Sequence, residues 1–265
     1  MFSSRVPSKA DIRLIRSLGQ KKFREELGMF VAEGEKLVEE ALRQDRFEVI
    51  ALYRTEETGT ELMSRMSHLA SPSPSLAVLR IPENRSHNTA SPLPSGLCLA
   101  LDSVRDPGNM GTILRMADWF GIRTVYLSPD CVDIYNPKTV QATMGSIFRQ
   151  NTCICNLAEL VRDSREAGIP VYATTLDGDD IRSTELNTSD ALILMGSERD
   201  GLSCELVQGS TCRLHIPSFD MEGDIRHTDT GNTSDSAESL NVAIATAVIC
   251  YEFRRRKQKS RTFID

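Results

Sequence analysis

The sequence predicts an α/β protein built from two domains, and three observations lead to this fold class. Apolar stretches of strand length alternate with segments of helical periodicity along most of the chain. The length of 265 residues is too great for one small domain and suits two. Residues 81–96 are rich in Ser, Pro and Asn, which is typical of a linker. We therefore predict a small domain over residues 1–80 and a larger domain over residues 97–265.

The small domain is expected to alternate helices and strands. Apolar residues recur at helical spacing from Ser8 to Leu18, and Gly28 then separates this helix from an apolar strand. A unit of this size is too small for an elaborate catalytic site. The expected helices are residues 8–18, the segment after Gly34 and residues 60–69, and the expected strands are residues 29–32, 47–53 and 76–79.

The larger domain is expected to hold a parallel sheet covered by helices on both faces, because its strands and helices alternate. Residues 218–238 fit neither element. Acidic residues stand there among Gly, Thr, Ser and Asn, so we expect a flexible loop. The expected strands are residues 97–101, 124–127, 152–155, 170–174, 191–195 and 211–216, and the expected helices are residues 109–120, 137–148, 157–167 and 240–257.

The charge pattern leaves a nucleic-acid partner open. The net charge of −6 argues mildly against such a partner, because phosphates attract Lys and Arg. Basic residues nevertheless cluster near both ends of the chain, and each cluster is either a solvated surface or an RNA contact. The two clusters are Lys9, Arg13, Arg16, Lys21, Lys22 and Arg24, and Arg254, Arg255, Arg256, Lys257, Lys259 and Arg261.

The composition argues against a membrane, secreted or metal-binding protein. The chain has no apolar run of about 18 residues and no apolar signal core at its start, so we expect no membrane contact and a cytoplasmic location. The 7 cysteines are scattered without a CxxC pair, and the 4 histidines lack the spacing of metal ligands. The acidic loop also lacks the spacing of an EF-hand, so we expect no metal site.

The first motif with chemical content runs from Asp106 to Arg115, between a predicted strand and a predicted helix. Glycines at a helix N-terminus leave backbone N–H groups available to an anion or a ribose phosphate. The spacing matches neither a dinucleotide-binding nor a Walker loop, so a nicotinamide-dependent enzyme is disfavoured. Taken alone, Arg115 is a surface arginine one and a half turns into the helix.

Two further motifs follow the last predicted strands. The apolar strand that ends at Met195 leads into a glycine-flanked acidic turn with Glu198, and ligands in open α/β sheets lie beyond such carboxyl ends. After Ile216-Pro217, the acidic loop leads to Ser239, which suits a helix N-cap, with Asn241 in the first turn. Each motif alone is also compatible with an ordinary turn or a capped helix.

Together and in this order, the motifs resemble those of the SpoU (TrmH) family of RNA ribose 2′-O-methyltransferases. The family patterns N-x-G-x-x-x-R, G-x-E-x-x-G-L and I-P followed by S-L-N-V-A are all matched. Residues 21–24 and 30–34 resemble the family's ribosomal-protein-like substrate-binding domain. The 21 residues of the acidic insertion, 218–238, depart from the family pattern, which has only a few residues there. The matched positions are Asn109, Gly111 and Arg115; Gly196, Glu198, Gly201 and Leu202; and Ile216, Pro217, Ser239, Leu240, Asn241, Val242 and Ala243.

The resemblance implies a SPOUT methyltransferase domain with a trefoil knot, preceded by the RNA-binding domain. It also implies a homodimer whose active site uses both subunits, and S-adenosylmethionine as the cofactor. The implied catalytic residues are Arg115, Asn109, Glu198, Ser239 and Asn241. The implied cofactor contacts are Gly196, Gly201, Ile216, Leu240 and Thr175, and Thr175 is expected on the loop after its strand. RNA would bind Lys21, Lys22 and Arg24.

The expected reaction is attack of a ribose 2′-OH on the sulfonium methyl carbon. The hydroxyl must lose its proton, and a guanidinium is normally a fixed cation. Two roles for Arg115 therefore remain, as a base or as a stabiliser of the developing alkoxide, and the second is favoured. The RNA is ribosomal or transfer RNA, with the N-terminal domain favouring ribosomal RNA. A non-catalytic assembly factor of the same fold and a methyltransferase acting on a base nitrogen are the alternatives.

Overall fold

The computed structural model describes residues 6–82, 93–219 and 239–261, and within these residues the chain forms two compact units. The first unit combines the N-terminal part with Asp106–Asp118 and Val132–Gln150. The second unit contains Ala90–Arg105, Trp119–Cys131 and the chain from Asn151 onward. The linker prediction and the acidic insertion fall largely outside the described residues, since only residues 81–82, 93–96, 218 and 219 of them are described.

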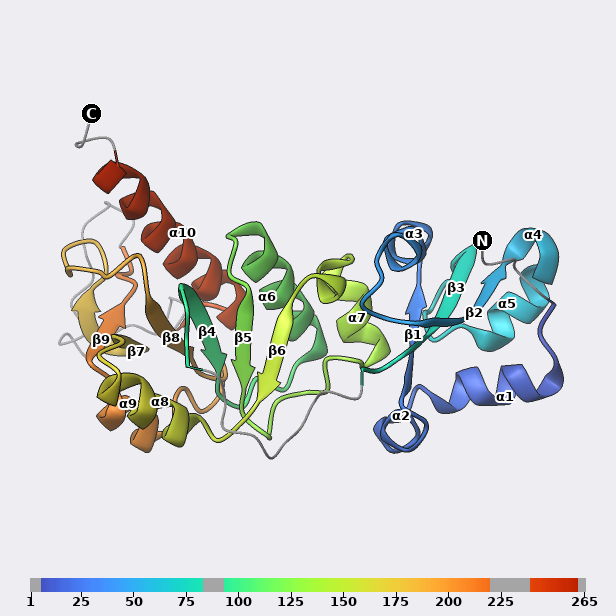
Figure 1. Ribbon diagram of the computed structural model, residues 1–265, viewed down its shortest axis with the longest axis horizontal. Helices are drawn as coiled ribbons and strands as arrows, with labels where there is room; N and C mark the ends of the chain where they lie inside the picture. The colour runs from blue at the N-terminus through green and yellow to red at the C-terminus, as the bar shows by residue number, and fades with distance from the viewer. Residues whose placement is uncertain (1–5, 83–92, 220–238, 262–265) are drawn as a thin grey trace. The chain divides into compact units, whose positions relative to one another are not determined.

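The first unit contains an antiparallel three-stranded sheet with strand order β1-β3-β2, in which Val31 pairs with Val78 (Figure 1). The predicted helices and strands of this part are confirmed, and two short helices, α2 and α4, were not predicted. One face of the sheet packs on α1 and α5 through a continuous apolar core. The elements are α1 (Lys9–Ser17), α2 (Lys21–Leu27), β1 (Met29–Glu33), α3 (Glu35–Arg43), β2 (Val49–Arg54), α4 (Thr55–Thr58), α5 (Thr60–Met66) and β3 (Ser75–Arg80).

A later segment of the chain completes the apolar core of this unit. The ring of Tyr135 lies 4.6 Å from that of Phe30, and the ring of Phe148 lies 5.7 Å from that of Phe47. All four side chains are buried. Such aromatic contacts bury large apolar areas, so the N-terminal sheet depends on residues far along the sequence. The segment contains α7 (Pro137–Thr143) and a 3-10 turn, η1 (Ser146–Phe148).

Helix α6 (Pro107–Trp119) begins with a side-chain cap and packs closely on α7. The Asp106 carboxylate accepts a hydrogen bond of 2.7 Å from the Asn109 amide. A Cβ atom at Gly111 would lie 2.5 Å from both the Thr139 carbonyl oxygen and the Ala142 Cβ. Gly111 therefore serves close helix packing, which differs from the anion-binding role that the sequence suggested for the glycines of this motif.

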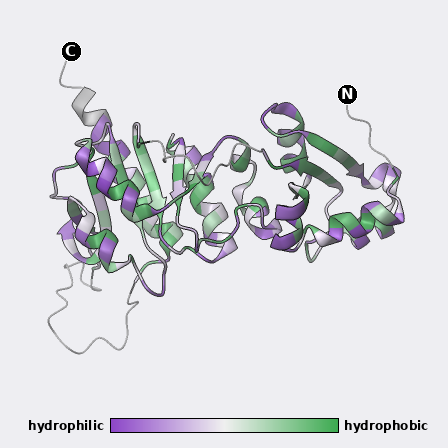
Figure 2. Ribbon diagram, turned by 60° about the horizontal axis from the view of Figure 1, so that its bottom comes forward, coloured by the Kyte–Doolittle hydropathy of each residue, from purple (hydrophilic) through white to green (hydrophobic). Residues whose placement is uncertain are grey.

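The second unit contains the predicted parallel sheet, with strand order β6-β5-β4-β8-β7-β9. Helices α8 and α9 pack on one face, and Phe253 of α10 packs on Tyr172 at a ring distance of 5.3 Å (Figure 1). Figure 2 shows the central strands mostly in the colour of hydrophobic residues. The elements are β4 (Leu97–Leu101), β5 (Thr124–Leu127), β6 (Asn151–Ile154), α8 (Leu157–Glu166), β7 (Val171–Asp180), β8 (Ala191–Met195), α9 (Cys204–Gly209), β9 (Cys212–His215) and α10 (Val242–Arg261).

Arginines of the C-terminal basic cluster form hydrogen bonds between α10 and the rest of this unit. The Arg254 guanidinium donates to the carbonyl oxygens of Phe120 and Gly121, at 2.6 and 3.0 Å. Arg256 donates to the carbonyl oxygens of Ile181 and Thr184. Both guanidinium groups therefore have structural partners, which favours the structural interpretation of this end of the cluster.

The Glu252 carboxylate of α10 makes a pH-dependent contribution to stability. Hydrogen bonds from Arg255, with a further contribution from Arg256, lower the pKa of Glu252 from 4.5 to about 2 although burial opposes this shift. A depressed pKa stabilises the fold above pH 4.5, and this stabilisation is lost as the pH falls towards 2.

Between pH 6 and pH 3, we expect the free energy of unfolding of the wild type to fall by about 2 kcal/mol more than that of the Glu252→Gln variant. Urea unfolding of both proteins at the two pH values measures this difference. Equal losses in the two proteins would show that the ion pairs contribute nothing.

Candidate active site

The first motif places Arg115 on the exposed surface of α6. Its guanidinium forms no hydrogen bond or ion pair with another described residue. Asn109 is half-buried in the first turn of the same helix, where Asp106 holds its amide. Both residues belong to the first unit. An exposed cation on a rigid helix is able to interact with a negatively charged group of a bound molecule.

The second motif forms a tight turn after β8. Ser197 and Gly201 exchange backbone hydrogen bonds of 3.1 and 3.0 Å, and Gly201 has a φ of +67°. A Cβ atom at Gly196 would lie 2.1 Å from the Gly201 carbonyl carbon, so the turn folds directly onto this glycine. The carboxylate of Glu198 is exposed on this turn. Just after the turn, the Ser203 amide donates a hydrogen bond of 2.9 Å to the Asp102 carboxylate.

Asn241 joins the third motif to the second. Its side-chain Nδ2 donates to Glu198 Oε1 at 3.1 Å. Its Oδ1 accepts from the amides of Ala243 and Ile244, at 3.0 and 3.3 Å, and so caps α10. The prediction that Ser239 is the N-cap is therefore wrong, because the helix begins at Val242 and Asn241 occupies the capping position.

Three predicted cofactor contacts, Gly196, Ile216 and Leu240, have backbone groups that are available for hydrogen bonds to a ligand. None of the three forms a backbone hydrogen bond with the described part of the chain. Gly196 follows β8 and Ile216 follows β9, so both lie at the carboxyl edge of the parallel sheet. The position of these groups fits a ligand with several hydrogen-bonding atoms, as expected for this edge.

Thr175 lies within β7 and not on a loop after the strand, which corrects the sequence prediction. Ala173 of β7 pairs with Leu194 of β8, so Thr175 and Gly196 each lie two residues beyond this pair. The Thr175 hydroxyl is buried and has no hydrogen-bond partner among the described residues. A buried hydroxyl without a partner is costly, and a bound polar group would satisfy it. These features fit S-adenosylmethionine, whose adenine and ribose are rich in such groups.

The three predicted RNA contacts of the N-terminal domain separate into two classes. Lys21 and Lys22 are exposed on α2. Arg24 is only 2% exposed, and its Nη2 lies 2.7 Å from Asp133 Oδ2, while its Nη1 donates to the Leu18 carbonyl oxygen at 2.8 Å. The prediction that Arg24 binds RNA is corrected, because protein acceptors already occupy this buried guanidinium.

Replacement of Arg24 by alanine is therefore expected to lower the free energy of unfolding by about 3 kcal/mol, because Asp133 would keep a partly buried charge without its partner. Lys22→Ala, on the exposed surface of the same helix, should change it by less than about 0.5 kcal/mol. Chemical denaturation measures both values. A small effect of Arg24→Ala would contradict the structural role.

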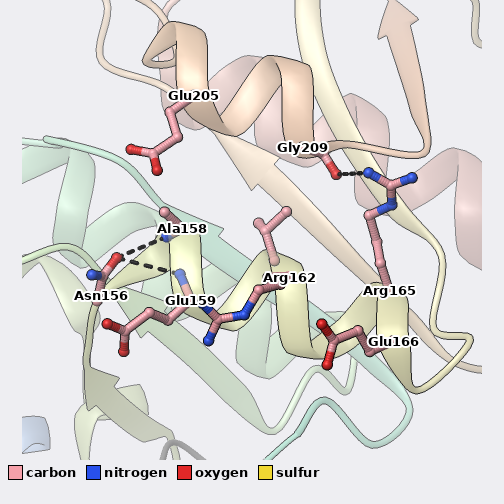
Figure 3. A pocket seen from close by; sticks show the side chains of 9 residues that line it. Asn156, Ala158, Glu159, Arg162, Arg165, Glu166, Glu205 and Gly209 are labelled. Atoms are coloured by element: carbon pink, nitrogen blue, oxygen red, sulfur yellow. Dashed lines mark hydrogen bonds between the residues drawn. The ribbon is translucent and has the colours of Figure 1, made fainter.

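A surface hollow lies away from the motifs. It measures about 720 Å³ between α8 and α9, where Arg165 reaches the carbonyl oxygen of Gly209 at 3.2 Å (Figure 3). Within the described residues there is no group of three metal-ligating side chains and no helix long and apolar enough to cross a membrane. The seven cysteines are free thiols.

Comparison with known proteins links both parts of the chain to RNA methylation. The sequence model of the SpoU rRNA Methylase family matches residues 96–226, and that of the MRM3-like substrate binding domain matches residues 9–79. The chain is 30% identical to 23S rRNA (guanosine(2553)-2'-O)-methyltransferase RlmP of Bacillus subtilis. This similarity covers 90% of the chain and 94% of that protein.

Solved structures show the same relationship. A TrmH-family protein from Porphyromonas gingivalis is 37% identical, with a TM-score of 0.80 over 95% of this chain and 99% of that chain. An AdoMet-bound rRNA methyltransferase from Sinorhizobium meliloti is 30% identical, with a TM-score of 0.78 over 96% of this chain and 98% of that chain. The similarity therefore extends over both units, and it includes a relative with S-adenosylmethionine bound.

Proposed function

The chain belongs to the SpoU rRNA methylase family, and from this premise we propose that it methylates a ribose 2′-OH of ribosomal RNA with S-adenosylmethionine. The observation that carries the proposal is the hydrogen bond of 3.1 Å between Asn241 and Glu198, which joins two motifs that lie 43 residues apart. Ribosomal RNA is favoured over transfer RNA because a relative that aligns with this chain over 94% of its length is named for 23S rRNA.

The cofactor would be held by backbone groups at the carboxyl edge of the parallel sheet. Gly196, Ile216 and Leu240 would bind its adenine and ribose, with the turn closed by Gly201 and the Thr175 hydroxyl close by. When bound, S-adenosylmethionine supplies an electrophilic methyl carbon on its sulfonium. The close approach of the Gly196 turn would exclude water from this edge.

Arg115 would act on the ribose oxygen that loses its proton. Its guanidinium stabilises negative charge on that oxygen, because a permanent cation favours the alkoxide and water or a phosphate oxygen accepts the proton. The alternative, in which Arg115 itself takes the proton, is tested by the substitutions discussed below. Asn109 would orient the ribose or Arg115, and Glu198, Asn241 and Ser239 would complete the polar surroundings.

Each part of the chain has a role in this proposal. Residues 1–80 would bind RNA, with contacts from Lys21 and Lys22, and residues 81–96 would link them to the catalytic domain. Residues 97–265 would form the SPOUT domain with its trefoil knot, and residues 218–238 would be an insertion in it. The match of the substrate-binding model to residues 9–79 supports this division.

A homodimer completes the proposal, and the exposed apolar stripe of α10 supports it. Ile244, Val248 and Tyr251 are 56%, 38% and 58% exposed, and their spacing places them on one side of the helix. Ile244→Asp should convert the dimer into a monomer. Sedimentation velocity measures the change, and Leu176→Asp, at a residue that is 66% exposed on β7, serves as the control. A dimer that survives Ile244→Asp would exclude this interface.

The reaction is tested with total RNA, both ribosomal and transfer RNA, that lacks its native modifications. The RNA is incubated with the protein and S-adenosylmethionine labelled on the methyl group, and the nucleosides are then separated. A labelled 2′-O-methylnucleoside in 23S RNA is the expected result. Label in transfer RNA alone would redirect the substrate assignment. Cofactor binding without label in any RNA would favour an assembly factor, and label on a base would exclude ribose methylation.

A further inference from the structure

Arg149, which follows η1, binds two carboxylates that come from distant parts of the sequence. Its Nε donates to Asp118 Oδ2 at 2.8 Å, and its Nη1 lies 2.5 Å from Glu40 Oε2. Glu40 belongs to α3, within the region matched by the substrate-binding model. Asp118 belongs to α6, three residues after Arg115. One side chain therefore connects the N-terminal part of the first unit to the helix that carries Arg115.

The surroundings of Arg149 hold both carboxylates in fixed positions. The Ser146 hydroxyl donates to the same oxygen of Asp118, at 2.8 Å. A Cβ atom at Gly145 would lie only 2.1 Å from Glu40 Oε2, so the Glu40 carboxylate sits directly against the backbone of this glycine. The side chains of Glu40 and Asp118 are 20% and 26% exposed, while the Arg149 side chain between them is 49% exposed. Solvent therefore screens the Arg149 charge in part, and the fixed geometry comes from its hydrogen bonds to the two mostly buried carboxylates.

Other contacts make the segment around Arg149 a rigid part of the same unit. The Arg46 guanidinium donates to the Gln150 carbonyl oxygen at 2.7 Å, next to the packing of Phe148 on Phe47. These contacts join residues 132–150 to the N-terminal sheet. The contact of Arg149 with Asp118 extends the connection to the end of α6.

We propose that Arg149 is a positioning residue that fixes the helix of Arg115 relative to the substrate-binding part of the chain. The inference rests on the proposed function, because it assumes that RNA binds to that part and that Arg115 acts on the ribose. RNA held by the N-terminal part then presents its ribose at a constant distance from Arg115. Loss of the connection leaves both binding steps intact and makes the reacting geometry rare, which lowers the catalytic rate.

The test compares Arg149→Gln and Arg149→Lys with the wild type. We expect Arg149→Gln to lower kcat by about tenfold, since misplacement of a catalytic group by about 1 Å costs up to a hundredfold. The dissociation constants for RNA and for S-adenosylmethionine should stay within twofold. Arg149→Lys keeps the charge and should recover part of kcat. The control is Arg162→Gln on α8, whose partner is the neighbouring Asp163, and it should leave all three values unchanged.

A role in folding alone gives a different result. In that case Arg149→Gln lowers the amount of folded protein, and kcat per folded molecule stays at the wild-type value, which would overturn the proposal. An equal fall in RNA affinity and in kcat/KM with kcat unchanged would also overturn it. Made in the wild-type protein, Glu40→Gln should lower kcat as much as Arg149→Gln does. Made in Arg149→Gln, it should lower kcat little further, as expected for two residues of one network.

Hydrogen exchange separates this inference from the proposed function. Amides in the last turns of α6 should exchange faster in Arg149→Gln and in Glu40→Gln than in the wild type, and Arg162→Gln should not change them. Unchanged exchange in Arg149→Gln would refute the connection whatever the activity. If Arg149→Gln exchanges faster but the wild type methylates no RNA, the connection stands and the proposed function is refuted.

Discussion

Replacement of Arg115 by alanine is expected to lower kcat for methyl transfer by about a thousandfold, which is the largest effect of any single substitution proposed. Groups that stabilise charge developing at an oxygen contribute about 100- to 1000-fold to kcat. Arg115 is exposed and forms no hydrogen bond or ion pair within the described residues, so its removal should leave the fold intact. The free energy of unfolding should change by less than about 0.5 kcal/mol.

Single-turnover methyl transfer with saturating RNA measures the effect, and calorimetry measures cofactor affinity in the same variant. Arg123→Ala, at another exposed arginine, is the control and should retain wild-type rates. Arg115→Lys distinguishes the two roles of the residue, because a lysine ammonium loses its proton more readily than a guanidinium. A rate above that of the wild type would favour the role as base, whereas a rate between a tenth and the full wild-type value favours charge stabilisation by the positive lysine. Transfer by Arg115→Ala within threefold of the wild type would refute any catalytic role.

Replacement of Gly196 by alanine should abolish cofactor binding. The new Cβ atom would lie 2.1 Å from the Gly201 carbonyl carbon and 2.3 Å from the Leu202 amide nitrogen. Both are backbone atoms, so the turn with Glu198 must move as a whole. We expect the dissociation constant for S-adenosylmethionine to rise by more than a hundredfold, together with a loss of about 2 kcal/mol in unfolding free energy.

Isothermal titration with S-adenosylmethionine provides the measurement, and it requires no RNA. The matched control is Gly108→Ala in the first turn of α6, where the new Cβ would meet only the flexible Asp106 carboxylate at 3.1 Å. This control should bind the cofactor normally. Normal binding by Gly196→Ala would show that the turn has room to move and is not part of the cofactor site.

Strands and long helices could be predicted because burial marks them in the sequence. The strand Ala191–Met195 is apolar at every position and buried on both faces, so its bounds could be predicted correctly. Helices α2 and α9 were missed because each is short and has a single buried residue, which is too few to form a periodic apolar pattern. The extension of β7 from Thr175 to Asp180 is mostly polar, and Leu176, Asp177 and Asp179 are exposed, so its sequence gives no strand signal.

The candidate site was predicted from motifs, while its contacts required the structure. Glu198 and Asn241 could both be named, but no local pattern shows that they bind each other across 43 residues. Arg24 was assigned to RNA because residues 21–24 resemble the family's substrate-binding domain. Its partner Asp133 lies 109 residues away, so only the folded chain reveals that this charge is buried. Arg149 carries no motif, and its role follows entirely from the two carboxylates that it contacts.

The packing of Tyr135 and Phe148 on Phe30 and Phe47 sets an order of events during protein synthesis. The N-terminal sheet leaves the ribosome well before these two aromatic partners are translated. At ~5–20 residues per second the delay is on the order of ten seconds, and the face with Phe30 and Phe47 stays uncovered for that time. An uncovered apolar face on a nascent chain is a binding site for chaperones. The N-terminal domain therefore reaches its native state only after half of the protein has been made.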